Sequence, residues 1–469
     1  MSQLISGTIH SEDKSLQWDL YSQIASDTEV HLRDNKIESI RSPILSQGYA
    51  IRIIRDREKG PDGDPISGVG IAPGNFLQDE NDVGQTLKFA LEASKITSAP
   101  SYQLPSEKKA LPAVRISDTG IASDHYAAAK DLAEKVIALL DKETDIRATF
   151  CKIRLTNIAT SLENCFGLSL QKGETYAYFE AGLSPKSKDA GLAEYWPHNI
   201  ARRIEDLELE KNIPKWASFA RDSAKARTPD TGKYAVIFPP YVLSETVPRV
   251  VSFHAAASSL KKGMARWRNI GEKVWSDKVT IRDDGLLDYG IATSPFDDEG
   301  TPQQITGIIR KGEFQNYITN NMYARFVSSQ STGNGLKTSK FHGVPCYQDD
   351  IDLNRTNLVM EGGDSSMEEM IKETKRGLLI EQFSWMVPDA ITGSFGSEIR
   401  HAYLIENGKV GNAIKGGVLN GSFFDTQGSD ETQEKGAFNS LDLISKETYF
   451  GWASVLPYVR FPEIRISGR

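Results

Sequence analysis

The chain has 469 residues, of which 39% are hydrophobic and 25% are charged. These proportions indicate a globular protein of two or three domains and exclude a fibrous or low-complexity chain. A formal net charge of −8 without a long basic run argues against nucleic-acid binding. Three cysteines are too few for a disulfide scaffold or for a zinc site built from cysteines alone.

The first residues show neither the basic start nor the apolar stretch of a signal peptide. No apolar segment reaches the roughly 18 residues that a membrane-spanning helix needs. We therefore expect a cytoplasmic protein that does not contact a membrane.

The first half of the chain has the pattern of a mixed α/β region. Residues 50–55 are β-branched and partly alternating, which predicts a strand, and residues 83–95 carry apolar side chains at helical spacing. Residues 124–142 predict a longer helix, for which Ser123 is the expected N-cap. We expect an N-terminal α/β domain at residues 1–110 and a central mixed α/β segment at residues 111–230.

The second half, residues 231–469, has the pattern of a β-rich domain. Short β-type runs flank recurring turn dipeptides, and three of these predict hairpins: 279–293 about Asp284-Gly285, 306–318 about Lys311-Gly312, and 403–414 about Asn407-Gly408. Two helices interrupt the strands, at about 248–267 and at 366–375, where Ser365 or Ser366 is the cap. The predicted fold class is therefore α+β, a mixed α/β N-terminal region followed by a large, mainly antiparallel β domain.

One histidine lies where a zinc hydrolase would need it. In the sequence His-Glu-x-x-His, a helix presents two imidazoles to the metal and a glutamate to the metal-bound water. His254 lies on a predicted helix, but Ala255 holds the glutamate position, and Ser258 or Ser259 holds the position of the second histidine. We interpret His254 as a packed or surface histidine of the helix.

Other reactive side chains have simpler interpretations. The acidic runs Asp283-Asp284 and Asp297-Asp298-Glu299 have the chemistry to bind a hard cation, but short acidic residues also satisfy backbone N–H groups in turns, and we favour turns. Cys165 becomes a nucleophile only with a histidine beside it in space, so we favour a buried small hydrophobe.

An ordered series of motifs carries a resemblance to a known family. They are Ile281-Arg282-Asp283-Asp284-Gly285, residues 294–302 (SPFDDEGTP), residues 331–335 (STGNG), Asn357-Leu358, residues 361–366 (EGGDSS), residues 374–379 (TKRGLL), residues 392–395 (TGSF) and residues 405–408 (IENG). In this series the C-terminal half resembles the TldD/PmbA family, also called modulator of DNA gyrase proteins and grouped with the U62 peptidases. Residues 52–59 and 91–95 resemble its N-terminal part.

The resemblance implies a role without catalysis. TldD-type subunits of this family carry a His-Glu-x-x-x-His zinc motif and a later cysteine ligand. PmbA/TldE-type subunits lack them and pair with a TldD-type subunit as a heterodimeric protease for unfolded peptides. Residues 251–258 keep His254 alone, so the chain is similar to the PmbA/TldE type. We expect no catalytic, cofactor-binding or metal-binding residue in it, and zinc in a TldD-like partner.

Two alternatives remain open at this point. One is a stand-alone protein that binds peptides or small ligands as a homodimer, without peptidase activity. The other is an autonomous hydrolase that uses Asp297, Glu299 and His342 from separate loops. The family binds peptide as an added strand within a chamber, which suggests residues 301–309 as a strand near that chamber, although an ordinary structural strand is an equal interpretation.

Overall fold

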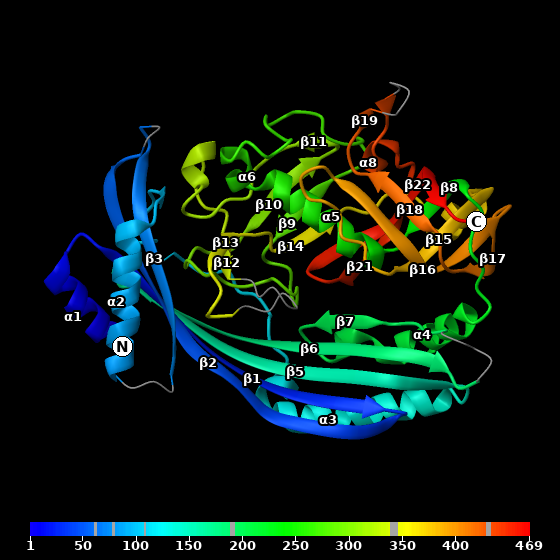
Figure 1. Cartoon of the computed structure of the whole chain (residues 1–469), viewed down its shortest axis with the longest axis horizontal. Coiled ribbons are helices and arrows are strands. Elements are labelled where there is room, and N and C mark those ends of the chain that lie inside the picture. The colour runs from blue at the N-terminus through cyan, green and yellow to red at the C-terminus, as the bar shows by residue number, and fades with distance from the viewer. Residues whose placement is uncertain (61–62, 77–79, 107–108, 188–192, 338–345, 428–432) are drawn as a thin grey trace.

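The computed structural model describes all 469 residues except 61–62, 77–79, 107–108, 188–192, 338–345 and 428–432. Figure 1 shows a long curved sheet with a β-rich domain above it and a smaller lobe, containing α1 and α2, at one end. The helices are α1 (Ser2–Glu12), α2 (Glu80–Ile96), α3 (Thr119–Lys142), α4 (Leu209–Ser223), α5 (Pro240–Ala255), α6 (Ala257–Lys261), α7 (Met367–Glu373) and α8 (Ala437–Ser440).

The strands fall into two large sheets and two short pairs. The first sheet has the order β4-β3-β2-β1-β5-β6-β7, and the second the order β11-β10-β9-β14-β22-β18-β16-β15-β8, with β17 and β21 beside it. Their bounds are β1 Gln17–Arg33, β2 Lys36–Lys59, β3 Pro65–Asn75, β4 Ala99–Pro100, β5 Ile146–Asn164, β6 Ser169–Pro185, β7 His198–Ala201, β8 Gly232–Phe238, β9 Ile281–Asp284, β10 Ile305–Arg310, β11 Glu313–Phe314, β12 Gly335–Lys337, β13 Ile351–Leu353, β14 Asn357–Met360, β15 Arg376–Phe383, β16 Ser394–Glu406, β17 Lys409–Ile414, β18 Val418–Ser422, β19 Thr426–Gln427, β20 Gln433–Glu434, β21 Leu443–Gly451 and β22 Ser454–Ser467.

The first sheet is antiparallel and covered by α3 on one face (Figure 1). Alternation along β1 decides which side chains meet the helix: Val30 and Leu32 pack in the same core as α3, whereas Glu29 lies on the other face. β1 pairs with β5, so strands from residues 1–110 and from residues 111–230 share this sheet. The division into two segments at residue 110 stays a prediction.

The second sheet forms the C-terminal domain and is mainly antiparallel, with parallel pairs only at β14–β22 and β15–β8 among its described ladders. Its core is rich in aromatic side chains, of which Trp275, Phe314, Phe438 and Phe461 are almost completely buried. The α+β fold class predicted from the sequence is confirmed. Within the described residues, no helix is both long and apolar enough to cross a membrane.

Several predicted elements differ from those observed. Helix α3 begins at Thr119, where Asp118 is the N-cap and accepts hydrogen bonds from Gly120 and Ile121, and it is kinked at Asp124, whose backbone is not helical. The helix predicted from residue 124 is the part after this kink, but its cap is Asp124, which accepts from the backbone of Tyr126 and Ala127, so the prediction of Ser123 was wrong. The helix expected at 248–267 is two helices, α5 and α6, separated at the extended residue Ala256. No hairpin forms about Asp284-Gly285, since β9 pairs with β10 and β14.

Other predictions are confirmed. The hairpins about Lys311-Gly312 and Asn407-Gly408 are β10–β11 and β16–β17. Ser366 caps α7 in a capping box with Glu369.

Candidate functional site

Helix α5 carries the histidine that the sequence singles out. The helix begins at Pro240, where the missing N–H of proline costs nothing, and it runs through a strongly apolar stretch into the core of the C-terminal domain. His254 lies in its last turn. The chain then becomes extended at Ala256 before α6 begins, so Ser258 and Ser259 do not continue the same helical face.

His254 is completely buried in an aromatic environment. Its ring centroid lies 4.9 Å from that of Phe424 and 5.6 Å from that of Trp267, and the backbone N–H of Arg266 donates to its Nδ1 at 3.1 Å. Burial, together with the nearby charge of Arg266, lowers the pKa of His254 to about 4. The imidazole is therefore neutral at physiological pH and is held as a hydrogen-bond acceptor within the core.

These surroundings do not fit a zinc ion. A catalytic zinc needs three nitrogen, sulfur or oxygen ligands and an open position, but His254 meets carbon faces of aromatic rings. In the described part of the chain, no three His, Cys, Asp or Glu side chains gather as a metal site would require. The prediction that this chain holds no cofactor, with zinc in a partner, is not tested by this and stays a prediction.

The two acidic runs are buried, and each places one carboxylate in a turn. The carboxylate of Asp297 accepts hydrogen bonds from the backbone N–H groups of Glu299 (3.0 Å) and Thr301 (2.8 Å), and Asp284 accepts from the backbone N–H of Leu286 at 3.1 Å, as expected of turns. Asp283 differs from this expectation, because it lies within β9 and accepts from the distant Asn334 and from the backbone of Thr356, both at 2.7 Å.

Glu299 joins the C-terminal domain to the first sheet. Its Oε1 lies 2.9 Å from NH1 of Arg52, a buried residue of β2 that also pairs with Asp19 of β1. Its Oε2 accepts two hydrogen bonds from Asn321 at 2.9 Å. The set Asp297, Glu299 and His342 therefore has one member in a turn and one in a structural ion pair, whereas His342 lies outside the described residues.

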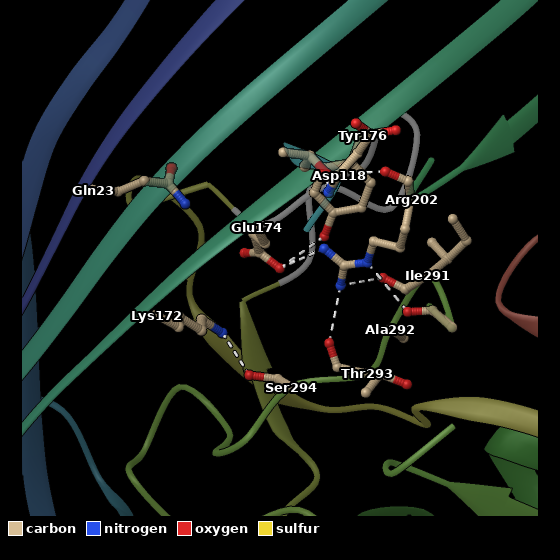
Figure 2. Close-up of polar contacts among 12 residues, drawn as sticks. Gln23, Asp118, Lys172, Glu174, Tyr176, Arg202, Ile291, Ala292, Thr293 and Ser294 are labelled. Carbon is tan, nitrogen blue, oxygen red and sulfur yellow. Dashed lines mark hydrogen bonds and ion pairs between the residues drawn. The ribbon is translucent and has the colours of Figure 1, made fainter. Parts of the chain in front are cut away.

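A second buried cation makes a similar connection, shown in Figure 2. Arg202, the residue directly after β7, pairs with Glu174 of β6 at 2.8 Å and donates to the backbone carbonyls of Gly290, Ile291 and Thr293 in the C-terminal domain. The side chain is 1% exposed. Below Arg202 in Figure 2, Lys172 of β6 donates a hydrogen bond to the hydroxyl of Ser294 at 3.1 Å. The face of β6 and β7 is therefore fixed against the loop before residue 295.

A cavity of about 840 Å³ lies between the two sheets beside this junction. Its walls come from the segment 195–201, from α4, from the start of α5, from β15 and from the β21–β22 hairpin. This volume falls in the range of sites that hold small molecules. Aromatic side chains line much of it, namely Tyr195, Trp216, Phe219, Tyr241, Tyr289, Tyr449, Phe450, Trp452 and Tyr458.

A chain of polar groups runs through one wall of the cavity. Tyr241 and Glu245, one turn apart on α5, share a hydrogen bond, and the Tyr241 hydroxyl lies 3.0 Å from Nε2 of His198. The rings of Tyr241 and Trp452 contact that of His198 from two sides. Burial raises the pKa of Glu245 to about 7.

The sequence analysis did not identify Glu245, Tyr241 or His198 as a group. A signal was present, because Pro239-Pro240 is a typical helix start, and a helix from Pro240 would have placed Tyr241 and Glu245 on one face.

Cys165 is half-buried against the core of α1 and α2, and burial raises the pKa of its thiol, which disfavours the reactive thiolate.

The strand expected at 301–309 is partly confirmed as β10, which begins at Ile305. It lies next to the end of the second sheet, and β11 pairs only with its residues Ile309 and Arg310. Ile305 is 53% exposed. Within the described ladders, the outer side of the first part of β10 has no strand partner, as an added peptide strand would require.

Residues 231–468 match the family described as the PmbA/TldA metallopeptidase C-terminal domain. The metalloprotease TldD homologue of Haemophilus influenzae is 33% identical over 189 residues, which covers 39% of this chain and 38% of that protein. The chain thus matches less than half of that relative's length.

Two crystal structures have the same fold over nearly the whole chain. TldE from Thermococcus kodakarensis superposes with a TM-score of 0.79 at 19% identity and covers 100% of both chains. A modulator of a DNA gyrase from Thermotoga maritima superposes with a TM-score of 0.81 at 17% identity and covers 99% of both. At these identities the likeness shows the fold alone.

Proposed function

Because the chain belongs to the PmbA/TldD metallopeptidase family, we propose that it is the non-catalytic, PmbA/TldE-like subunit of a zinc-dependent peptidase. A TldD-like partner supplies the zinc and the catalytic residues, and the pair degrades unfolded peptides in the cytoplasm. The observation that carries this proposal is the aromatic environment of His254 on α5, which offers a neutral, buried imidazole and, within the residues that the structure describes, no cluster of further metal ligands.

The open part of β10 supports a role in holding peptide. Backbone hydrogen bonds to an exposed strand recognise an extended peptide whatever its side chains, which suits a protease for unfolded chains. The exposed side chain of Ile305 gives such a peptide an apolar contact. This chain would then contribute binding surface to the shared chamber while its partner carries out the hydrolysis.

Native co-purification tests the partner arrangement. The chain, tagged in its own host, should bring down a near 1:1 partner that carries His-Glu-x-x-x-His, as identified by mass spectrometry. Metal analysis should then find zinc in the pair and none in this chain alone. Recovery of this chain by itself as a homodimer would contradict the proposal and favour the stand-alone binding protein, for which the 840 Å³ cavity is the supporting observation.

Replacement of His254 tests the non-catalytic role. We expect His254→Ala to leave the peptidase activity of the reconstituted pair nearly unchanged when folding is intact, because the imidazole contacts only the core. A loss of about 100-fold or more, the effect of removing an acid–base group, would show that His254 takes part in the chemistry.

A further inference from the structure

The cavity between the two sheets has walls that suit a particular kind of ligand, and the proposed peptidase role makes no use of it. Most of its outer charges are paired. Arg115 pairs with Asp288 at 2.6 Å, and Lys211 pairs with Glu208 at 3.0 Å, with all four side chains well exposed. Arg203 pairs with both Glu205 and Asp206, so the rim carries one acidic side chain in excess.

The interior differs from the rim because it holds buried carboxyl groups. Glu381 of β15 lines the cavity and is only 7% exposed. Among the described residues its one cationic neighbour within 4 Å is Lys215, whose Nζ lies 3.7 Å from Oε2, which is beyond hydrogen-bonding distance. Glu245 stands behind Tyr241 on the next wall. One buried carboxyl group on the cavity wall thus has a single partly exposed ammonium group beside it.

Tyr195 lines the same cavity as Glu381. Its hydroxyl is buried, and its pKa is raised well above the usual value by burial and then by the negative charges of Glu381 and Glu245. A protonated hydroxyl at this point remains available to a ligand as a hydrogen-bond partner. The two carboxyl groups and this hydroxyl therefore act on the same part of the cavity.

Aromatic rings supply the remaining surface. Trp216 and Phe219 of α4 and Trp452 of the hairpin line the cavity, and Nζ of Lys215 already lies 5.2 Å from the ring centroid of Phe219. Aromatic faces attract cations, and they also bury apolar groups. The ammonium group of Lys215, placed between a ring and a carboxylate, occupies the kind of position that a cationic ligand would take.

We infer that this cavity binds a primary amine carried on an apolar or aromatic body, with its ammonium group at Glu381 and Tyr195 and its body against Trp216, Phe219 and Trp452. The interior charge favours a cation over an anion. The buried carboxylate provides the selectivity, because the charges at the rim are exposed to water. The ammonium of Lys215 competes with the ligand for Glu381.

Binding to the isolated, full-length chain tests this inference without a peptidase partner. The probes are phenethylamine and phenylacetamide, which are similar in size but differ in charge, and the readout is tryptophan fluorescence, because Trp216 and Trp452 line the cavity. We expect phenethylamine to bind at least about 10-fold more tightly, the value of a charge-assisted hydrogen bond. Equal binding of the two probes, or binding of neither, would overturn the inference.

Three variants locate the site. Glu381→Gln, which keeps the shape of the side chain, should weaken phenethylamine binding by about 10- to 100-fold. Lys215→Met should strengthen it, since the competing ammonium is removed. Weaker amine binding by Lys215→Met would indicate an anionic ligand and overturn the inference. Glu208→Gln, at the exposed rim, is the matched control and should bind as the unaltered chain does.

A last comparison identifies the source of the amine. The tripeptide Phe-Ala-Ala and its N-acetylated form differ only at the amino end. Preferential binding of the free peptide would support the site and identify the amino end of a peptide as its ligand. Binding of phenethylamine without either peptide would support the site for small amines. Equal binding of both peptides would contradict recognition of the ammonium group.

Discussion

His254 shows at the scale of one residue how a chemically capable side chain becomes structural. The imidazole lies in the last turn of α5, and the core around it favours the neutral form. A buried neutral histidine has a consequence for stability. Between the ordinary pKa of 6.5 and the folded value of about 4, the unfolded chain binds a proton that the folded chain does not.

We therefore predict that acid destabilises the protein partly through this residue. Stability should fall as the pH decreases from about 6.5 to about 4, and His254→Gln, which keeps an acceptor but does not titrate, should reduce this slope. Urea unfolding at pH 7.5, 6.0 and 5.0 measures how the free energy of unfolding changes with pH in the variant and in the unaltered chain. If the variant and the unaltered chain lose stability in parallel over this range, His254 is not responsible.

The sequence shows which residue types stand beside His254, but it does not show the polar chain at the other end of the same helix. Ala255 and Ser258 are visible as missing ligands without any structure. The contact of Tyr241 with His198 joins α5, a helix of the C-terminal domain, to β7 of the first sheet. No spacing rule connects such residues, because their proximity depends on how the two sheets pack.

At the scale of elements, the two hairpin turns allow a matched exchange. Lys311 and Asn407 both have positive φ, at 48° and 49°, and each precedes a glycine at a two-residue turn. Asparagine tolerates this conformation better than lysine does. We predict that Lys311→Asn stabilises the protein and that Asn407→Lys destabilises it, each by about 0.5–1 kcal/mol.

Thermal unfolding of the two single variants measures this pair of effects. Both positions are exposed, so that packing contributes little to either change. Shifts of the same sign in the two variants would show that the backbone conformation at these two positions does not decide the stability of the turns.

Element predictions succeeded where a local signal decides the structure and failed where a distant contact does. The turns at Lys311-Gly312 and Asn407-Gly408 and the cap at Ser366 are local. The sequence about Asp284-Gly285 has the same local signal, but β9 takes β10 and β14 as partners, and Asp284 instead accepts from the backbone of Leu286. Tertiary pairing there outweighs the turn preference.

At the scale of the whole molecule, buried cations hold the two sheets together. Arg202 connects Glu174 to three backbone carbonyls across the boundary, in a position almost without solvent (Figure 2). Arg115 crosses the same boundary to Asp288, but it is 67% exposed. The pair offers a direct comparison of a buried and an exposed contact.

We predict that Arg202→Met lowers the free energy of unfolding by about 3–5 kcal/mol, because Glu174 is left as a buried charge without its cation. Arg115→Met should cost about 1 kcal/mol or less, since water screens its partner. Denaturant unfolding of both variants checks this. Comparable losses would mean that burial does not determine the strength of the boundary.

The global arrangement was predicted only in part. The α+β class and the β-rich second half follow from turn signals and β-type runs. The cavity does not, since Glu381 belongs to a strand that reads as an ordinary buried run and its neighbours come from α4 and the β21–β22 hairpin. The ion pair of Arg52 with Glu299 joins residues far apart in the chain, and single charges carry no signal of such a partner.

The position of β22 within the second sheet also determines the order in which the domain can fold. This strand pairs with β8, β14, β18 and β21, so Gly232 finds its partner only at Ile466. During synthesis, β8 and β14 emerge long before that partner exists, and their edges stay open to other chains. The pairing of β8 with β22 also closes a loop that spans most of the domain, and closing so long a loop is slow. The domain is therefore exposed to aggregation until its last strand leaves the ribosome, and its yield should depend on chaperones.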